Sequence, residues 1–400
     1  MLSVLKKYSF LKFKAGNSLE TYGVDPLKLD VGPISFTIDD NLFEEYLRKL
    51  FNVPVRVLET RKLGEGFHAA GFLVTLNMDG RRRNLVLRVL RGDTGWGHEN
   101  PSDRAAVLLL QHRLFNRAPP GTCVKSLDVL CLKDDGSLLS LGGSIEFFQL
   151  VEEVTEAEGT PYVQDLHAIG KRGSLTERDI RRCQIAADYL VSLHSERLES
   201  PSLYMRHIRD LIGHGEMLMG VVDTYPDPSS LPWTSRREIE EIELGAVKWR
   251  NRIKHLTHRL RRIHGDFHPF GNIRFREDDS IIVLDPSRFE FGEPADDLAA
   301  LAINFIFISL WHHGVLKEPF QKLLRLFFDR YLDRTGDEEV LKVLPPFFAF
   351  RGLVIAHPLY YPQLDNGRRR KILSFVRNLL EDDSFNLDKV NAYLENLRQP

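Results

Sequence analysis

The residues of this 400-residue chain that could do chemistry together are concentrated between positions 264 and 285. His264, Gly265 and Asp266 begin a predicted loop, and Asn272 follows six positions after Asp266. Asp285 comes after a short predicted strand pair. Phosphoryl transfer needs a carboxylate beside the attacking hydroxyl and oxygen ligands for a Mg²⁺ ion that bridges the phosphates. Because a hairpin returns the chain to where it began, the two aspartates and the asparagine can converge, and the pattern favours phosphoryl transfer.

Two segments carry a resemblance to a known family. Residues 263–272 read Ile-His-Gly-Asp-Phe-His-Pro-Phe-Gly-Asn, and residues 292–299 read Gly-Glu-Pro-Ala-Asp-Asp-Leu-Ala. Both resemble the aminoglycoside phosphotransferase and choline kinase family, relatives of the protein kinases. The likeness covers roughly residues 55–312 and is dense only at 264–299. Asn272 stands one position later than the kinase pattern H-R-D-x-x-x-x-N places it.

The resemblance implies a role for each residue of this region. Asp266 would be the catalytic base, and His264 would orient its loop. Asn272 and Asp285 would be the Mg²⁺ ligands. Asp297 would be a structural carboxylate that braces the loop.

The first third of the chain offers candidate nucleotide contacts. Gly64 and Gly66 lie between two predicted strands, where glycine lets a backbone approach phosphate closely. Arg88 lies about 24 residues further on, in a strand resembling the kinase strand that bears the phosphate-binding cation. An ordinary turn and an exposed strand arginine are the plain alternatives.

A kinase-like site also pairs this cation with a carboxylate on a helix. The helix predicted over 102–116 has Val107 where that carboxylate is expected, and Asp103 or Glu99 could replace it. The connector around Glu152 and Val154 resembles the family's interdomain strand, whose backbone would hydrogen-bond the adenine ring.

Selection of the acceptor is predicted for the C-terminal part. Arg206, Asp210, His214 and Glu216 could line a pocket, or could belong to a solvated helix with local ion pairs. Arg351 stands in apolar company, which favours a structural ion pair with a carboxylate over a substrate contact. His194 is interpreted as a packing residue.

The predicted elements form three regions. Residues 1–44 are interpreted as an N-terminal extension, 45–153 as a β-rich N-lobe and 154–400 as a helical C-lobe. Strands are expected over 53–60, 70–77, 83–90, 124–132 and 144–152, with a hairpin turn at Met78-Asp79-Gly80. Later elements are helices over 180–194, 298–311, 320–331 and 370–380, and a strand pair at 272–276 and 280–284. The fold class is α+β: a bilobal protein-kinase-like fold with a small antiparallel N-lobe and a large, mainly helical C-lobe.

Composition excludes several other classes of protein. Fifty-four Lys and Arg against 56 Asp and Glu give a net charge of −2, which argues against a nucleic-acid partner. Three cysteines without a Cys-x-x-Cys pair indicate a cytoplasmic protein and no structural zinc. Residues 1–16 carry charges within their apolar stretch, so no signal peptide is expected. The apolar run 298–311 suits a buried core helix better than a membrane span.

The expected activity is transfer of the γ-phosphoryl group of ATP or GTP, with Mg²⁺, to a hydroxyl of a small molecule. Aminoglycoside, choline-like and sugar-like acceptors all fit. A catalytically silent nucleotide-binding scaffold is the alternative, suggested by the shifted Asn272 and by Val107. A protein kinase is disfavoured because only about twelve residues separate Asp285 from Asp297, too few for a peptide-docking loop.

Overall fold

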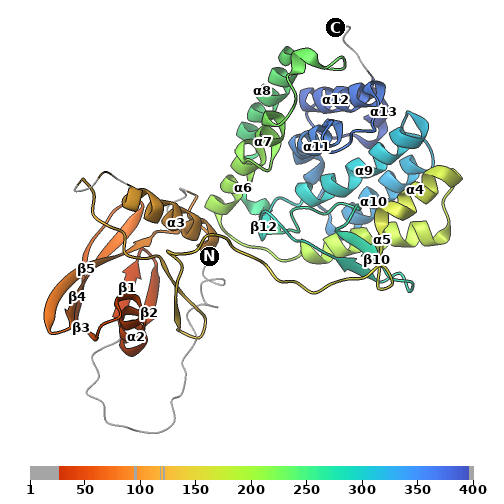
Figure 1. Ribbon diagram of the computed structural model, residues 1–400. Helices are drawn as coiled ribbons and strands as arrows, with labels where there is room; N and C mark the ends of the chain where they lie inside the picture. Colours follow the sequence, from red (N-terminus) through yellow and green to blue (C-terminus); the bar gives the residue numbers. More distant parts are fainter. Residues whose placement is uncertain (1–26, 94–96, 118, 120–121, 396–400) are drawn as a thin grey trace. The chain divides into compact units, whose positions relative to one another are not determined.

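The computed structural model describes residues 27–93, 97–117, 119 and 122–395. The chain divides into two compact units, Met1–Val151 and Glu152–Pro400, and each is described by itself (Figure 1). The sequence placed this boundary two residues later, after 153. Residues 1–16, on which the expectation about a signal peptide rests, lie outside the described residues. The first unit is β-rich and the second mainly helical, so the predicted α+β class is confirmed.

The first unit is built on an antiparallel sheet with the strand order β3-β4-β5. Its elements are β1 (Leu27–Val31), β2 (Ile34–Ile38), α2 (Asp40–Phe51), β3 (Val55–Glu65), β4 (Ala69–Met78), β5 (Arg81–Leu90), α3 (Pro101–Arg117), β6 (Leu130–Leu132) and β7 (Leu138–Ser140). The predicted hairpin turn is confirmed, because Met78 pairs with Arg81 across Asp79 (φ 49°) and Gly80 (φ 77°). Two consecutive residues with positive φ match the twist of the strands that they join.

The stretch interpreted as an N-terminal extension is described from residue 27 onward, and there it forms part of this unit. β1 and β2 make a hairpin, and α2 starts at Asp40, where the side chain of Asp39 accepts from the amides of Asn41 and Leu42. Alternate residues of β1 are buried in the core of the unit. The sequence missed this hairpin because its alternation extends over only five residues in each strand.

Two predicted strands fail in the second half of this unit. Of the strand expected over 124–132, only Leu130–Leu132 forms, and residues 144–152 form none. Ile145, Phe148 and Leu150 are instead 92%, 92% and 98% exposed. Apolar content suggested a strand here, but a strand exists only where a partner receives its backbone hydrogen bonds.

The second unit is a helical body with a few short strands. Its helices are α4 (Tyr162–Arg172), α5 (Glu177–Leu193), α6 (Pro201–Gly213), α7 (Leu218–Asp223), α8 (Arg236–Ile253), α9 (Ala295–His313), α10 (Phe320–Thr335), α11 (Val340–Ala356), α12 (Asn366–Glu381) and α13 (Val390–Tyr393). Its strands are β8 (Thr160–Pro161), β9 (Arg261–Arg262), β10 (Ile273–Phe275), β11 (Ile281–Val283) and β12 (Phe291–Gly292). The helices predicted over 180–194, 320–331 and 370–380 are confirmed as α5, α10 and α12.

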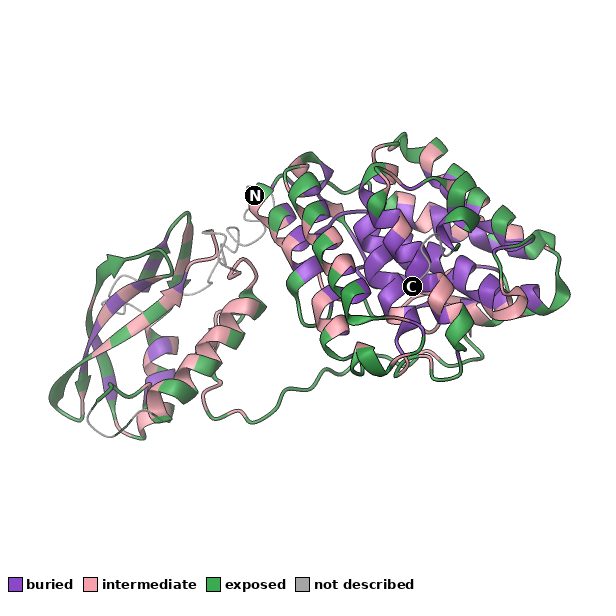
Figure 2. Ribbon diagram, turned by 90° about the horizontal axis from the view of Figure 1, so that it is seen from above, coloured by how far each residue is buried: buried purple, intermediate pink, exposed green. Residues whose placement is uncertain are grey.

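Helix α9 is the centre of this unit, where Figure 2 shows buried residues filling the interior. It is long and apolar enough to cross a membrane, but 89% of its apolar window is buried inside the protein. The predicted core helix over 298–311 is therefore confirmed. Because α9 begins with Asp296 and Asp297 and packs against α11, the core itself sets the position of these two carboxylates.

Candidate active site

A fully buried carboxylate holds the start of the loop between β9 and β10. Asp297 accepts from the backbone amides of His264, at 2.7 Å, and Gly265, at 2.8 Å. His194 Nε2 lies 3.1 Å from the same carboxylate, and its Nδ1 lies 2.9 Å from the hydroxyl of Tyr331. Burial alone would raise the pKa of Asp297, but His194 and the loop amides outweigh it and lower that pKa. Asp297 therefore braces the loop, and His194 packs behind it.

His264 and Gly265 give this loop its shape. The amide of Asp266 donates to His264 Nδ1 at 3.2 Å, and His264 Nε2 lies 2.9 Å from the carbonyl of Leu284. Since a carbonyl only accepts and an amide only donates, the proton of this imidazole is on Nε2. Gly265 has φ 82°, and a Cβ there would lie 2.0 Å from the carbonyl oxygen of Ser287. Only glycine fits this position.

Asp266 carries the most strongly engaged carboxylate of the loop. Its Oδ1 pairs with Arg351 Nη1 of α11 and with Arg288 Nη1, which lies 2.9 Å away. Both guanidinium groups also donate to the carbonyl of Gly265. Burial would raise the pKa of Asp266, but the two arginines hold it well below its usual range. The carboxylate is therefore ionised at neutral pH.

Asn272 and Asp285 lie at one end of the β10–β11 hairpin. The side-chain Nδ2 of Asn272 donates to the carbonyl of Asp266 at 2.8 Å, and the amide of Leu284 donates to the carbonyl of Asn272. Asp285 follows Leu284 directly, is exposed, and has φ 54°. A positive φ costs a non-glycine residue roughly 1–3 kcal/mol and recurs at functional sites. The hairpin therefore brings Asp266, Asn272 and Asp285 to one region, although Asn272 stands one position late in the sequence.

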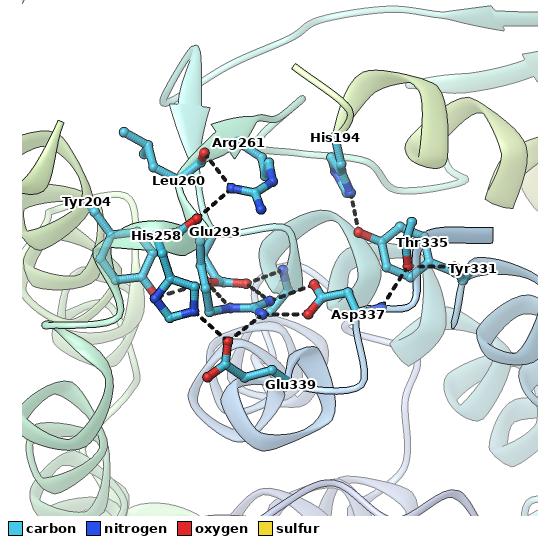
Figure 3. Close-up of polar contacts among 12 residues, drawn as sticks. His194, Tyr204, His258, Leu260, Arg261, Glu293, Tyr331, Thr335, Asp337 and Glu339 are labelled. Carbon is cyan, nitrogen blue, oxygen red and sulfur yellow. Dashed lines mark hydrogen bonds and ion pairs between the residues drawn. The ribbon is translucent and has the colours of Figure 1, made fainter. Parts of the chain in front are cut away.

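A second buried network fixes the chain just before α9, and Figure 3 shows its side chains converging on Glu293. Glu293 is fully buried and accepts from the hydroxyl of Tyr204 at 2.8 Å and from both Nε and Nη2 of Arg259. Arg259 also pairs with Asp337 and Glu339. Removing Arg259 would leave the buried charge of Glu293 uncompensated. This network anchors the start of α9, and with it Asp296 and Asp297.

The predicted nucleotide contacts of the first unit occupy one hairpin and its neighbouring strand. Gly64 is in β3 opposite Gly71, and the amide of Gly66 donates to the carbonyl of Ala69 in the turn to β4. Arg88 of β5 is exposed, and its Nη1 donates to Gln111 Oε1 of α3 at 3.4 Å.

The helix residue that faces the cation is therefore Gln111, one turn after Val107. Asp103 instead accepts from the amide of Asn100, and Glu99 from that of Gly97. The possibility that Asp103 or Glu99 replaces the missing carboxylate stays a prediction.

Glu152 and Val154 open the second unit in a stretch without regular secondary structure. Glu152 is exposed and Val154 is half-buried. Their backbone groups make no strand-to-strand hydrogen bonds among the described strands. The backbone N–H and C=O groups are therefore available to bond a ligand.

The residues predicted to line an acceptor pocket make local contacts. Arg206 and Arg209 both pair with Asp210 along α6, and the amide of Glu216 donates to His214 Nδ1. Because Asp210 is buried, α6 is not simply a solvated helix, and the acceptor pocket stays a prediction.

Sequence reasoning missed His207 of α6. It is fully buried, lies against Phe289 with ring centroids 4.8 Å apart, and has its Nε2 3.9 Å from Asp296. A histidine on an apolar helix face gave no signal of its own.

Arg351 was predicted to make a structural ion pair, and it does, with Asp296 at 2.8 Å. What the sequence did not reveal is that its other partner is Asp266. Arg288 was missed altogether, because it lies in a loop without any pattern. The signal available was the almost uniformly apolar sequence of α11, in which a single buried arginine needs a carboxylate partner.

Together these contacts define what the region can do. An ionised carboxylate and an amide oxygen are held by hydrogen bonds on a loop, and an exposed second carboxylate follows the adjoining hairpin. Oxygen donors of this kind suit a magnesium-bound phosphate and a hydroxyl nucleophile. Among the described residues no group of three or more His, Cys, Asp or Glu is arranged to hold a metal by itself.

No protein-family model matches this sequence, and no curated protein sequence matches it. Several solved structures do match. An ADP-bound aminoglycoside phosphotransferase is 15% identical, with 86% of this chain and 97% of that chain covered and a TM-score of 0.30. An ethanolamine kinase of Plasmodium vivax is 12% identical, with 87% of this chain and 84% of that chain covered and a TM-score of 0.33. A choline kinase of Streptococcus pneumoniae is 14% identical, with 86% of this chain and 99% of that chain covered and a TM-score of 0.33. All three are small-molecule kinases or phosphotransferases, but TM-scores this low add nothing to the geometry described above.

Proposed function

We propose that this protein transfers the terminal phosphoryl group of a nucleoside triphosphate, ATP or GTP, to a hydroxyl of a small molecule. The observation that carries the proposal is that Asp297 and His264 fix the backbone around Asp266, and that the side chain of Asn272 bonds the carbonyl of Asp266. His264 also lies within hydrogen-bond distance of the carbonyl of Leu284, the residue before the exposed Asp285. Such preorganisation is what a phosphoryl-transfer site requires, because positioning and charge supply most of its catalysis.

Asp266 is proposed to orient the acceptor's hydroxyl and to take its proton. A carboxylate whose pKa is held low is a weak base, but it is a permanently ionised hydrogen-bond acceptor. In the loose transition state of phosphoryl transfer the hydroxyl has formed little bond to phosphorus, so its proton need not be removed until late in the reaction. The role of Asp266 is therefore mainly to aim the nucleophilic oxygen.

Asn272 and Asp285 are proposed to hold Mg²⁺. The Nδ2 of Asn272 is committed to the carbonyl of Asp266, which leaves its Oδ1 for a ligand. Asp285 adds an exposed carboxylate directly after Leu284, whose amide bonds the carbonyl of Asn272. Two oxygen ligands suffice, because Mg²⁺ takes its other ligands from phosphates and water. Bound there, Mg²⁺ would neutralise charge on the phosphates.

Gly64, Gly66 and Arg88 are proposed to contact the phosphates of the nucleotide, and the backbone around Glu152 and Val154 its base. The exposed Arg88 has donors beyond the one used by Gln111. A Cβ added at Gly64 would meet no atom within 4 Å. The hairpin is therefore open there, and a phosphate can approach its backbone.

The decisive experiment measures ADP release against a panel of small alcohols for wild type and Asp266→Asn. This change keeps size and hydrogen bonding but removes charge. We expect normal binding of Mg²⁺ and nucleotide, with turnover lower by about 10²–10⁴-fold. Asp278→Asn is the matched control, because Asp278 is an exposed carboxylate in the turn of the β10–β11 hairpin and its side chain accepts hydrogen bonds from Ser280. Equal turnover of Asp266→Asn and wild type would reject the assignment of Asp266.

The metal assignment has a separate test. Asp285→Ala should abolish the Mg²⁺-dependent part of nucleotide affinity, measured by calorimetry with and without Mg²⁺. The variant should still fold, because Asp285 is exposed and alanine at φ 54° costs at most about 1–2 kcal/mol. Unchanged Mg²⁺ dependence would remove Asp285 from the site.

The double pairing of Asp266 with Arg288 and Arg351 favours one other function, a catalytically silent nucleotide-binding scaffold. A carboxylate engaged by two guanidinium groups has fewer lone pairs for a hydroxyl. Tight nucleotide binding without transfer to water or to any alcohol of the panel would support the scaffold.

A further inference from the structure

The charges around Asp266 bear on the kind of acceptor that could sit beside it. Its Oδ1 is shared by Arg351 and Arg288, and His268 Nε2 lies 3.7 Å from its Oδ2. The side chains of Asp266, Arg288 and His268 remain 16%, 16% and 30% exposed. Both carboxylate oxygens of Asp266 therefore have cationic or hydrogen-bond-donating groups beside them, and a small ligand that reaches Asp266 meets these groups.

The guanidinium of Arg288 is only partly paired at this position. Its Nη1 serves Asp266 and the carbonyl of Gly265, whereas its buried Nε has no hydrogen-bond partner among the described residues. The buried Nε of Arg351 is likewise without one. Leaving a buried donor unpaired costs about 1–3 kcal/mol. Arg288 also has φ 69°, so its backbone adopts a strained conformation to place the guanidinium here.

Arg351 is offset by Asp296, which leaves Asp266 as the carboxylate that Arg288 pairs with among the described residues. Asp296 and Asp297 are fully buried, and each is engaged, by Arg351 and by the loop amides respectively. An ammonium group on the acceptor would need an accessible, unpaired carboxylate, and the exposed Asp285 of this region is the residue that the proposed function gives to Mg²⁺. Beside Asp266 it would meet Arg288 instead, and like charges in contact disfavour binding.

We propose that the acceptor carries an anionic oxygen group, a carboxylate or a phosphate, next to its reacting hydroxyl, and that Arg288 binds this group. This inference extends the proposed function and rests on it, because only a phosphotransferase has an acceptor. A guanidinium presents paired donors in a plane that matches the oxygens of a carboxylate or phosphate. The acceptor is thus a hydroxy acid or a phosphorylated alcohol rather than an amine.

A matched acceptor series tests this. Glucuronate, glucose and glucosamine share a ring and differ in an acid, a neutral and an amine group, and glycerol phosphate and glycerol form a second pair that separates phosphate from carboxylate. We expect kcat/KM to be highest for an anionic member, at least about tenfold above its neutral partner, and lowest for the amine. Preference for glucosamine, or no preference in either series, would overturn the proposal.

Arg288→Gln should remove this preference. We expect a loss of about 10–100-fold in kcat/KM for the anionic acceptor, mainly through KM, and a smaller loss for the neutral one. Arg288→Lys keeps the charge and should retain part of the preference. Arg236→Gln is the control, because Arg236 pairs with Asp227 on the surface at 73% exposure. An equal fall in kcat for every acceptor would assign Arg288 to the transferred phosphoryl group and overturn the proposal.

Binding measured without turnover separates this inference from the proposed function. Calorimetry with glucuronate and with glycerol phosphate, in the absence of nucleotide, should show binding that Arg288→Gln abolishes. If that holds while no acceptor is phosphorylated, the anion site stands and the phosphotransferase proposal fails. If alcohols are phosphorylated without anion preference or anion binding, the phosphotransferase stands and this inference fails. Neither binding nor transfer would reject both.

Discussion

The helical unit and the β-rich unit hold their proposed functional residues in different ways. In the helical unit Asp266 sits in a loop tied down by Asp297, which is itself fully buried and makes three polar contacts. In the β-rich unit Arg88 is exposed, and its contact with Gln111 is 3.4 Å long. Helix α3, which carries Gln111, has no buried residue.

This contrast follows from what each unit can bury. The helical unit has a continuous core around α9, so charged groups can be placed inside it and satisfied by several partners. The smaller core of the β-rich unit joins β1 and β2, α2 and the sheet, and leaves the far side of the sheet with exposed residues such as Val86. Interactions in a low-dielectric interior are stronger than those at a surface. Changes to the buried brace of the helical unit should therefore affect folding first, and changes to the exposed contacts of the β-rich unit should affect binding first.

The largest effect is expected for Asp297→Ala. It removes the acceptor for two buried amides and the partner of His194, so we expect a loss of about 3–5 kcal/mol in the stability of the helical unit. Asp128→Ala is the matched change in the β-rich unit, because Asp128 accepts from the Tyr46 hydroxyl and the Gly142 amide while half-buried. There we expect about 1–2 kcal/mol. Hydrogen exchange resolved for each unit measures both losses of stability. Equal losses in the two units would show that they hold their carboxylates equally firmly.

A second pair compares two glycines. Gly265→Ala should cost about 2–4 kcal/mol, because φ is 82° and the new Cβ would lie 2.0 Å from the carbonyl oxygen of Ser287. Gly64→Ala meets no atom within 4 Å and should leave stability unchanged or slightly raised. Its effect should appear only in nucleotide affinity. Denaturation followed by tryptophan fluorescence reports the helical unit, which holds three of the four tryptophans, Trp233, Trp249 and Trp311. Equal stability of Gly265→Ala and wild type would mean that the loop is looser than its contacts indicate.

Arg88→Met tests the β-rich unit through binding. A strand-borne cation on phosphate contributes a charge-assisted bond of about 1.5–3 kcal/mol, so nucleotide affinity should fall by roughly 10–100-fold. Stability should change by less than about 0.5 kcal/mol, because Arg88 is exposed. Arg88→Lys should be milder. Calorimetric affinity equal to that of wild type would make Arg88 an ordinary surface residue.

How far the sequence could predict this structure also differs between the units. The loop from His264 to Asn272 and the brace at Asp297 were predictable, because the motif residues lie close together and a hairpin brings Asp285 back to them. The core helix α9 was predictable from its apolar run. Contacts that depend on tertiary packing were not. Arg351 reaches Asp266 across 85 positions, and no local pattern records that pairing.

In the β-rich unit the three-strand sheet was predicted with its turn, since alternation and Asp79-Gly80 are local signals. The strand expected over 144–152 failed, because apolar residues alone do not provide a pairing partner. The helix partner of Arg88 was expected at Val107 and is Gln111, a shift of one helical turn. Helix α3 has no buried residue, so its sequence has no apolar face from which the rotation of the helix about its axis could be predicted.

The smallest effect is expected for Gln111→Ala. The bond from Arg88 Nη1 to Gln111 Oε1 is long and lies between exposed groups, where water replaces it readily. We expect nucleotide affinity to change by less than about threefold and stability by less than about 0.5 kcal/mol. A double-mutant cycle with Arg88→Met isolates the coupling, which should be close to zero, in contrast to the strong coupling expected between Asp297 and His194. Gln111→Glu adds charge to the same pair and should raise the coupling without altering the fold. If Gln111→Ala instead weakened nucleotide binding as much as Arg88→Met, then α3 would hold Arg88 in place as firmly as α9 holds the loop of Asp266. The two units would then position their functional residues by the same means.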